Sequence, residues 1–458
     1  MSKIIEINPS TELIYKEFDE TSNDDIDLIV ENAKKNKNWS KKSIEERVFI
    51  ISKIIPILEE KREKLAHTMA SEMGKSLKSG RHEVSIIIKR IEDYCEMIPS
   101  FIENEIIFDS ETEKNIVHFE PRGVVAVISP WNAPVFVPLA SIIPALLTGN
   151  NVVFKPSEYS TEIGIVISEV FNELKKYGFP ENSFQLVIGG KDKGKYLVEN
   201  DIDMTVLIGS LRAGQQIAKS SSEKLKNFIL ELGGKDPAIV LEDADLDNSV
   251  IQIVKAATMY TGQVCFGVER VYCHGKIYDE FIEKCVEEMK KIKVGDPMNE
   301  ETDMGPFAVK FQLEKVIEHI KDAINKGAKL IYGGKKIGEK GYFFEPTILT
   351  DVNHSMKIMK EETFGPVIPI MKFKDENEAI KLANDSDYGL TASIWTKNIK
   401  KGEEIARKIE AGTVEVNRHG LSKAGCPWGG YKLSGFGRIY SKEGIRQFMN
   451  TKHIWIVK

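Results

Sequence analysis

Short apolar segments alternate with helical or polar segments through the middle of the chain. The ranges 123–128, 151–154, 184–188, 204–208 and 227–230 are mostly apolar and rich in Val and Ile, and the segments between them have helical spacing or composition. Strands buried on both faces read as nearly continuous apolar runs. The alternation therefore predicts a parallel sheet that helices cover on both sides.

A second series of the same kind follows the first. It begins with the apolar range 237–241 and ends near 414–416. A chain of 458 residues has room for two or three domains of about 100–200 residues each. The pattern predicts two α/β units in succession, and the Gly-rich range 425–437 after them is expected to be a loop region.

The range 22–97 has a pattern typical of helices. Ser43 and Glu46 form a capping box, in which each side chain bonds the other residue's backbone N–H, and apolar residues then recur near helical spacing. We expect Pro56 to kink or end this helix and Gly74 to end another. These helices are expected to be scaffold.

A hairpin is predicted between the helices and the first α/β unit. The apolar groups 106–108 and 116–119 flank the polar stretch 109–115, as in two strands joined by a turn. The strand-like segment 451–457 is expected to accompany them. Exposed strand edges need cover, so these segments fit oligomerisation.

One cysteine has surroundings that suit a nucleophile. Cys265 follows the apolar range 251–259, which predicts a buried helix, and Gly262 and Gly267 are expected to reduce the bulk on either side of the sulfur. A thiol becomes a good nucleophile when its thiolate is stabilised and a carbonyl can approach. On this stretch alone, an inert buried cysteine is an equal alternative.

A carboxylate upstream is a candidate general base. Glu231 follows the apolar range 228–230 and precedes Gly233 and Gly234, so it is expected at the mouth of a strand. A carboxylate in this place can take a proton from water. The alternative is a salt-bridged carboxylate at a strand end.

Both stretches resemble motifs of the aldehyde dehydrogenase superfamily, in its NAD(P)-dependent, non-phosphorylating branch. They read Glu231-Leu232-Gly233-Gly234-Lys235 and Gly262-Gln263-Val264-Cys265. Three further motifs follow the family's order, namely Pro130-Trp131-Asn132-Ala133-Pro134, Lys155-Pro156-Ser157-Glu158 and Glu361-Glu362-Thr363-Phe364-Gly365-Pro366. The resemblance runs from about Asn8 to the C-terminus, and ordered motifs are more specific together than singly.

The resemblance implies an α/β fold with a Rossmann-like cofactor domain, a second α/β catalytic domain and a small β oligomerisation element. The cofactor domain is expected to comprise residues 1–104 and 122–233, and the catalytic domain residues 234–434. Residues 105–121 and 435–458 are expected to form the oligomerisation element. In proteins of this family the element pairs with a partner subunit, which implies a homodimer or homotetramer.

The resemblance also implies oxidation of an aldehyde to a carboxylic acid. Cys265 is expected to attack the carbonyl, and Glu231 to activate the water that hydrolyses the resulting thioester. The side-chain amide of Asn132 and the backbone N–H of Cys265 are the expected donors to the oxyanion. From local sequence alone, Asn132 suits a cap of the following helix equally well.

NAD is the expected cofactor, and NADP is possible. Lys155 and Glu158 match positions that hold the adenosine ribose, where a carboxylate favours NAD over the 2′-phosphate of NADP; without the other motifs they would be a surface ion pair. Gly209 and Ser210 are expected between a strand and a helix, whose free N–H groups favour a pyrophosphate. The other expected cofactor contacts are Ser129, Pro130, Trp131, Leu232, Glu362 and Phe364.

The chain departs from the family at the pyrophosphate turn. Relatives typically have Phe-Thr before the Gly-Ser pair and Thr after it, whereas Leu207, Ile208 and Leu211 stand here. The departure affects the detailed contacts and not the turn. Glu362 and Phe364 match positions beside the nicotinamide and its ribose, and otherwise read as a charged loop with a core aromatic residue.

The substrate is expected to be an apolar or small neutral aldehyde. Relatives that oxidise semialdehydes often carry an Arg on the helix after Asn132 to hold a carboxylate, and this chain has none there. Arg418 is the nearest substitute, so a succinate-semialdehyde-type enzyme stays an alternative. A CoA-acylating dehydrogenase and a catalytically silent binding protein are further alternatives.

Composition and charge limit the classes of protein to which the chain can belong. With 42% hydrophobic and 29% charged residues and a net charge of −6, the chain is typical of a soluble globular protein without general attraction to nucleic acid or membranes. Its five cysteines lack disulfide or zinc spacing, so no metal is expected. With no apparent signal peptide, a cytoplasmic location is expected.

Overall fold

The apolar segments of the first series form one sheet in the computed structural model, which describes residues 2–458. The strand order is β19-β9-β8-β5-β6-β7, with β19 antiparallel at one edge and the other strands parallel. The strands are β5 (Val124–Ile128), β6 (Asn151–Lys155), β7 (Phe184–Leu186), β8 (Met204–Ile208), β9 (Asn227–Glu231) and β19 (Gly435–Phe436). The predicted strands are confirmed with small shifts at their ends.

Helices cover both faces of this sheet because side chains alternate along each strand. Val125 and Val127 belong to the core with α6 (Phe136–Leu147) and α7 (Thr161–Glu173). Val124 and Ala126 face the opposite core. The helices on that side are α1 (Asn23–Lys35), α8 (Lys191–Glu199) and α9 (Leu211–Glu223).

Four helices lie behind α6 and α7 and complete the larger core. They are α2 (Ile44–Ser52), α3 (Ile54–Glu60), α4 (Arg62–Met73) and α5 (Leu77–Phe101). The capping box of Ser43 and Glu46 is present, and Gly74 ends α4 at φ 71°, as predicted. The break falls at Lys53 and not at Pro56, which lies in the first turn of α3, where its missing N–H costs nothing.

The second series forms a seven-stranded sheet with the order β12-β13-β14-β11-β10-β16-β17. Its strands are β10 (Asp236–Val240), β11 (Val268–His274), β12 (Lys329–Tyr332), β13 (Thr347–Thr350), β14 (Val367–Phe373), β16 (Thr391–Trp395) and β17 (Thr413–Val416). One face packs on α10 (Leu246–Thr258) and α11 (Tyr278–Met289). The other packs on α12 (Lys310–Asn325), α14 (Glu376–Asn384) and α15 (Ile399–Ala406).

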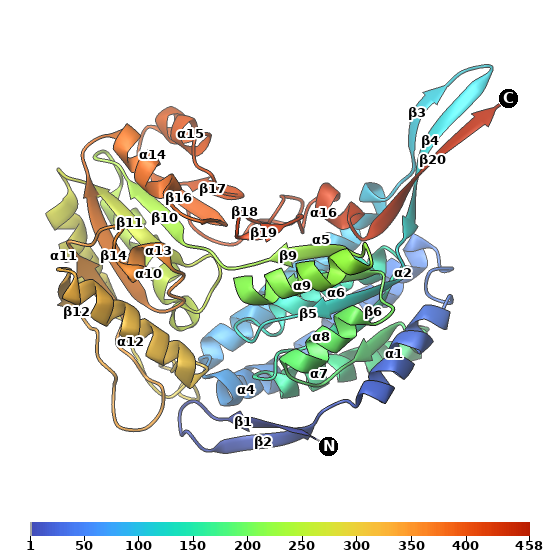
Figure 1. Ribbon diagram of the computed structural model, residues 1–458, viewed down its shortest axis with the longest axis horizontal. Helices are drawn as coiled ribbons and strands as arrows, with labels where there is room; N and C mark the ends of the chain where they lie inside the picture. Colours follow the sequence, from blue (N-terminus) through green and yellow to red (C-terminus); the bar gives the residue numbers. More distant parts are fainter. Residues whose placement is uncertain (1) are drawn as a thin grey trace.

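The two sheets occupy the two lobes seen in Figure 1, and residues 232–235 connect β9 of one lobe to β10 of the other. The chain returns through residues 417–434 before β19 joins the edge of the first sheet. The range 425–437, expected as a loop, therefore contains the short strands β18 (Tyr431–Lys432) and β19. The smaller elements are β1 (Lys3–Ile7), β2 (Ile14–Asp19), α13 (Lys357–Lys360), β15 (Tyr388–Gly389) and α16 (Lys442–Arg446).

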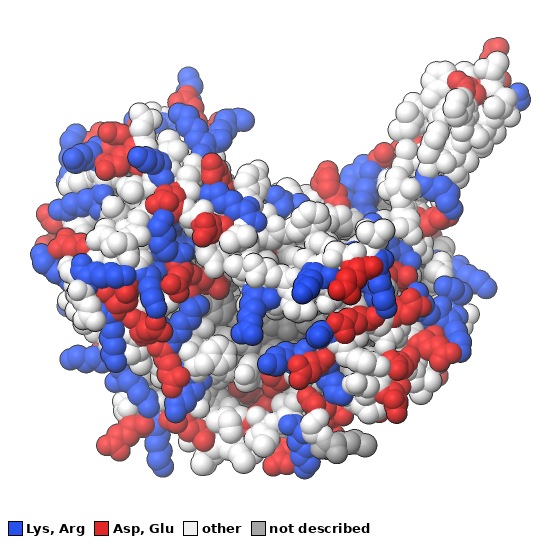
Figure 2. Space-filling view, in the orientation of Figure 1, with Lys and Arg blue, Asp and Glu red and all other residues white. Residues whose placement is uncertain are grey.

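A three-stranded arm projects from the body (Figure 1). The predicted hairpin, β3 (Glu105–Asp109) and β4 (Glu113–Pro121), pairs with β20 (Met449–Val457), as expected. Its exposed apolar side chains are Ile106, Ile107, Phe108, Trp455, Ile456 and Val457. Figure 2 shows acidic and basic residues interspersed over the body, whereas the face of the arm turned to the viewer is mostly uncharged. None of the helices in residues 2–458 has the length and apolar character to cross a membrane.

Candidate active site

Glu231 is the last residue of β9, at the mouth of the strand as predicted. Its side chain is buried, and the indole N–H of Trp428 donates to its Oε1 at 2.9 Å. Burial raises the pKa of Glu231 to about 8, although the Trp428 hydrogen bond acts in the opposite direction. Glu231 is not salt-bridged within residues 2–458, so the alternative of an ion-paired strand end is not supported.

The glycines after Glu231 allow three parts of the site to approach closely. A Cβ atom on Gly233 would lie 2.1 Å from Oε1 of Glu362, and one on Gly234 would lie 2.9 Å from the backbone oxygen of Cys265. The backbone N–H of Gly234 donates to the Glu362 carboxylate at 3.3 Å. Burial raises the pKa of Glu362 to about 7. The absence of side chains at positions 233 and 234 therefore lets the strand end, the Cys265 backbone and Glu362 approach closely.

Cys265 follows a left-handed turn. Tyr260, Thr261 and Gly262 have φ values of 51°, 62° and 70°, a conformation that costs free energy for the first two. The hydroxyl of Thr261 donates to the Gly305 carbonyl at 3.0 Å, and the ammonium of Lys75 lies 3.6 Å from the centre of the Tyr260 ring. These contacts hold the turn in place.

The role of Gly262 differs from the one expected. A Cβ atom there would lie 2.1 Å from the backbone carbon of Gly365, so the absent side chain allows two backbone segments to pack together. The preceding helix α10 also differs from prediction: it spans Leu246–Thr258, and Ile251 is 50% exposed because one face of the helix meets solvent. Local sequence could not show either contact.

The Cys265 thiol is half-buried and surrounded by carboxyl groups. Burial raises its pKa well above the usual value, and the negative charges of Glu231, Asp236 and Glu362 raise it further. The thiol is therefore protonated in the resting site at neutral pH. A base or a bound molecule would have to favour the thiolate for this sulfur to react as a nucleophile.

Asn132 does not cap the following helix. Its Nδ2 donates to the backbone oxygen of Gln263 at 2.8 Å, which points the amide toward the segment that carries Cys265. Instead, the Glu83 carboxylate accepts hydrogen bonds from the backbone N–H groups of Val135 and Phe136, at 2.8 and 2.9 Å. The helix-cap alternative for Asn132 is wrong, and no local pattern indicated the distant Glu83.

Glu269 holds the loop that carries Glu362 and Phe364. Its two carboxylate oxygens accept the backbone N–H groups of Thr363 at 2.6 Å and Phe364 at 2.7 Å, and Lys235 pairs with it at 2.6 Å. Phe364 then packs edge-on against Trp131, with ring centres 5.8 Å apart. Trp131 of the first lobe and Phe364 of the second, both predicted cofactor contacts, are therefore adjacent.

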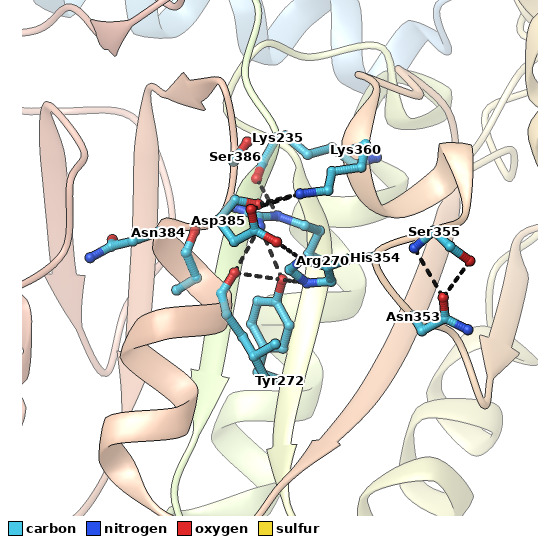
Figure 3. A network of polar contacts seen from close by, with 12 residues as sticks. Lys235, Arg270, Tyr272, Asn353, His354, Ser355, Lys360, Asn384, Asp385 and Ser386 are labelled. Carbon is cyan, nitrogen blue, oxygen red and sulfur yellow. Dashed lines mark hydrogen bonds and ion pairs between the residues drawn. The ribbon is translucent and has the colours of Figure 1, made fainter.

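A polar network that includes Arg270, Tyr272, Lys360 and Asp385 lies next to the start of this loop (Figure 3). Arg270 donates to the Lys235 carbonyl at 2.8 Å and to the Tyr272 hydroxyl at 3.0 Å. Asp385 pairs with Lys360 at 2.8 Å, at the end of the short helix that precedes Glu361. The loop is consequently anchored to β10, β11 and the end of α14.

The predicted cofactor residues gather at one edge of the first sheet, since carboxyl ends of parallel strands share an edge. Ser129 follows β5, Lys155 ends β6 and Gly209 follows β8. Ser210 caps α9, and its hydroxyl accepts the Ala213 N–H at 3.3 Å. Leu232 is also a predicted cofactor contact, but its side chain packs under α9 in an apolar cluster.

The chemistry of this edge fits a dinucleotide. The hydroxyl of Ser129 is buried and, within residues 2–458, has no hydrogen-bond partner, so it is available to a ligand. The Lys155 side chain is buried, which lowers its pKa, and its ammonium donates to the Pro156 carbonyl at 2.8 Å. Glu158 is half-buried nearby. No group of three or more His, Cys, Asp and Glu in the described residues could hold a metal ion.

His419 is a neighbour of Cys265 that sequence reasoning missed. Its Nε2 lies 2.6 Å from the backbone oxygen of Phe266, and burial lowers its pKa to about 4. If the neutral imidazole donates its Nε2–H to this carbonyl, Nε2 cannot accept the proton of the Cys265 thiol. Arg418 beside it pairs with Glu415 at 2.5 Å.

We predict that Glu231→Gln makes Cys265 more reactive at a given pH. Above the Glu231 pKa of about 8, the substitution removes a negative charge that raises the thiol pKa, so the pH profile of alkylation should move to lower pH. Iodoacetamide labelling of the Cys265 peptide, followed by mass spectrometry from pH 6 to 10, measures the shift, and the exposed Cys426 is an internal control. Identical profiles in both proteins would contradict the electrostatic account.

Comparisons with known proteins agree with this geometry. The profile of the "Aldehyde dehydrogenase family" matches residues 2–454. The 3,6-anhydro-alpha-L-galactose dehydrogenase of Vibrio sp. (strain EJY3) is 36% identical over 98% of this chain and 95% of its own length. The lactaldehyde dehydrogenase of Escherichia coli (strain K12) is 34% identical over 98% and 94%.

Solved structures give the same result. The NAD+ complex of the aldehyde dehydrogenase from Bacillus cereus superposes with a TM-score of 0.95 and 35% identity, over 100% of this chain and 93% of that protein. Other similar structures are complexes with NAD or NADP. The profile match over nearly the whole chain, the sequence identities and the shared fold together show that this chain belongs to the NAD(P)-dependent aldehyde dehydrogenase family.

Proposed function

We propose that this protein oxidises an uncharged aldehyde to the carboxylic acid, with Cys265 as nucleophile and Glu231 as general base. The observation that carries the proposal is the packing of residues 233–234, which brings the Cys265 backbone and the Glu362 carboxylate against the strand end that bears Glu231. A nucleophile and a base on adjoining segments are the two groups that acyl transfer to water requires.

The first step forms a thiohemiacetal. After the thiol has lost its proton, the Cys265 thiolate bonds to the aldehyde carbon, the C=O π pair moves to oxygen, and negative charge develops there. Asn132 uses one amide N–H for Gln263 and retains a second N–H for this oxygen, beside the backbone N–H of Cys265. One such preorganised donor typically contributes about 2.7–4 kcal/mol to the stability of the transition state.

The dinucleotide would be held by Ser129, Lys155, Glu158, Ser210 and Glu362. When bound, it supplies the acceptor for the hydride that leaves as the thiohemiacetal becomes a thioester. Trp131 and Phe364 would enclose the reacting end, since their rings already pack edge to face. Exclusion of water at that stage strengthens the electrostatic interactions inside the site.

The last step hydrolyses the thioester. Glu231 takes a proton from water, the hydroxide oxygen bonds to the acyl carbon, and Cys265 leaves as the thiolate. Only the ionised Glu231 can accept this proton, and its pKa is raised to about 8. Hydrolysis should therefore become faster as the pH rises toward 8 and slow below it.

We predict opposite kinetic patterns for two substitutions. Cys265→Ser should abolish NADH formation, whereas Glu231→Gln should retain one rapid burst of NADH and slow the following turnover by about 10²–10⁴-fold, because only hydrolysis loses its base. Stopped-flow absorbance at 340 nm measures both phases. Undiminished steady-state turnover of Glu231→Gln would remove Glu231 from the mechanism, and acyl-CoA formation on addition of CoA would favour the acylating alternative.

We also predict a preference for NAD. The Glu158 carboxylate would repel the 2′-phosphate of NADP, so kcat/KM should be at least about tenfold higher with NAD, which corresponds to about 1.4 kcal/mol. Glu158→Gln should narrow this ratio without loss of the NAD reaction. Glu169→Gln, on the exposed face of the following helix α7, is the control. A higher kcat/KM with NADP in the unsubstituted protein would refute the assignment.

The surroundings of Arg418 favour an uncharged substrate. Its guanidinium pairs with Glu415 and donates to the Leu421 carbonyl at 2.8 Å, so it is already engaged. A semialdehyde that relied on Arg418 would have to break an existing ion pair.

We therefore predict that succinate semialdehyde is used no better than butanal, which has the same chain length. Arg418→Ala should change kcat/KM for the semialdehyde less than about threefold, because Arg418 is already paired with Glu415. Loss of a hydrogen bond from Arg418 to a substrate carboxylate would instead cost about 1.5–3 kcal/mol, or roughly 10–160-fold. Steady-state kinetics with both aldehydes measures the difference. A loss confined to the semialdehyde and larger than tenfold would establish the semialdehyde alternative.

The arm supports a homodimer or homotetramer. Its exposed apolar side chains, including Ile106, Ile107 and Trp455, need cover that the described chain does not provide. In the proposed division, residues 105–121 and 435–458 form this element, although β19 extends the sheet of the cofactor half. The cofactor half comprises 1–104 and 122–233, and the catalytic half 234–434.

A further inference from the structure

Trp428 makes a buried hydrogen bond to the proposed base. Its side chain is 2% exposed, and its Nε1 donates to Oε1 of Glu231 at 2.9 Å. An indole has one N–H and no acceptor, so this bond uses its whole polar capacity. Among the hydrogen bonds of residues 2–458, it is the one side-chain donor to the Glu231 carboxylate.

The indole ring is held in place on several sides. It packs edge to face against Phe266, the residue after the nucleophile, with ring centres 5.8 Å apart, and lies 6.3 Å from the ring of Tyr440. Its backbone exchanges two hydrogen bonds with Ile439, at 2.8 and 3.0 Å. The donor is therefore fixed relative to both Cys265 and Glu231.

A hydrogen bond to a carboxylate favours its ionised form. In the buried surroundings of Glu231 this effect opposes desolvation, which by itself favours the acid. A phenylalanine would fill much of the same space and pack against Phe266, but it would leave the carboxylate without this donor. The indole nitrogen thus has a role that the ring's apolar packing does not explain.

We propose that Trp428 is a positioning residue for the proposed general base, whose indole N–H fixes the orientation of the Glu231 carboxylate and favours the carboxylate over the acid during thioester hydrolysis. The inference rests on the proposed function, because it concerns the step assigned to Glu231. It adds a residue from the return segment 417–434 to a site built from β9 and the Cys265 turn. Hydride loss, which precedes hydrolysis, should be affected little.

Trp428→Phe tests this role. The substitution should move the pH midpoint of steady-state turnover upward by about one unit, which makes hydrolysis about tenfold slower at pH 7. The burst of NADH should keep its amplitude, and its rate should change less than about threefold. In a Glu231→Gln background the same substitution should have no further effect on hydrolysis, a result that a general loss of packing would not produce.

Trp395→Phe is the matched control. Trp395 is also fully buried, and its Nε1 donates to a neutral partner, Ser393 Oγ at 3.1 Å, in the seven-stranded sheet. The same loss of an indole donor there should leave the pH midpoint unchanged. An unshifted midpoint in folded Trp428→Phe, or an equal shift in Trp395→Phe, would overturn the inference.

A second measurement does not depend on whether Trp428→Phe folds. With ¹⁵N-labelled indoles, one of the five tryptophan side-chain N–H signals should titrate with the Glu231 carboxylate and stop titrating in Glu231→Gln. A set of indole signals that is insensitive to pH would refute the role of Trp428. If instead Glu231→Gln turned over normally, the proposed function itself would fail, so the two failures are distinguishable.

Discussion

The site depends on one steric constraint, the absence of side chains at Gly233 and Gly234. A methyl group at Gly233 would displace the Glu362 carboxylate, and one at Gly234 would press on the Cys265 carbonyl. Because this link also joins the two sheets, the same four residues, 232–235, connect the lobes and bring their functional groups together. Close approach of backbone to a reacting centre is a use for which glycine alone is suited.

Two buried ion pairs hold the surrounding segments. Glu83, paired with Lys75, accepts the first N–H groups of α6, and Lys75 also lies over the Tyr260 ring that precedes Cys265. Glu269, paired with Lys235, accepts the N–H groups of the loop that carries Phe364. Desolvation makes such pairs weak sources of net stability. Here each carboxylate also satisfies backbone donors, so the pairs define where the segments lie.

Electrostatics relates this arrangement to the proposed chemistry. Burial raises the pKa of Glu231 to about 8 and that of Glu362 to about 7, and it raises the pKa of the Cys265 thiol well above its usual value. Carboxyl groups that titrate near neutral pH exchange protons readily, as a general base must. The same desolvation keeps the thiol protonated in the resting site, which limits unwanted reactions.

The sequence by itself determined the parallel strands, the capping box at Ser43, the left-handed end at Gly74 and the motifs that carry Cys265 and Glu231, because each is a pattern within a few residues. Tertiary structure decided the rest: the contact of Gly262 with Gly365, the capping of α6 by Glu83, and the bond from Trp428 to Glu231 across 197 residues of sequence. These contacts join residues that are far apart in the sequence and close in space. Only folding of the whole chain brings them together.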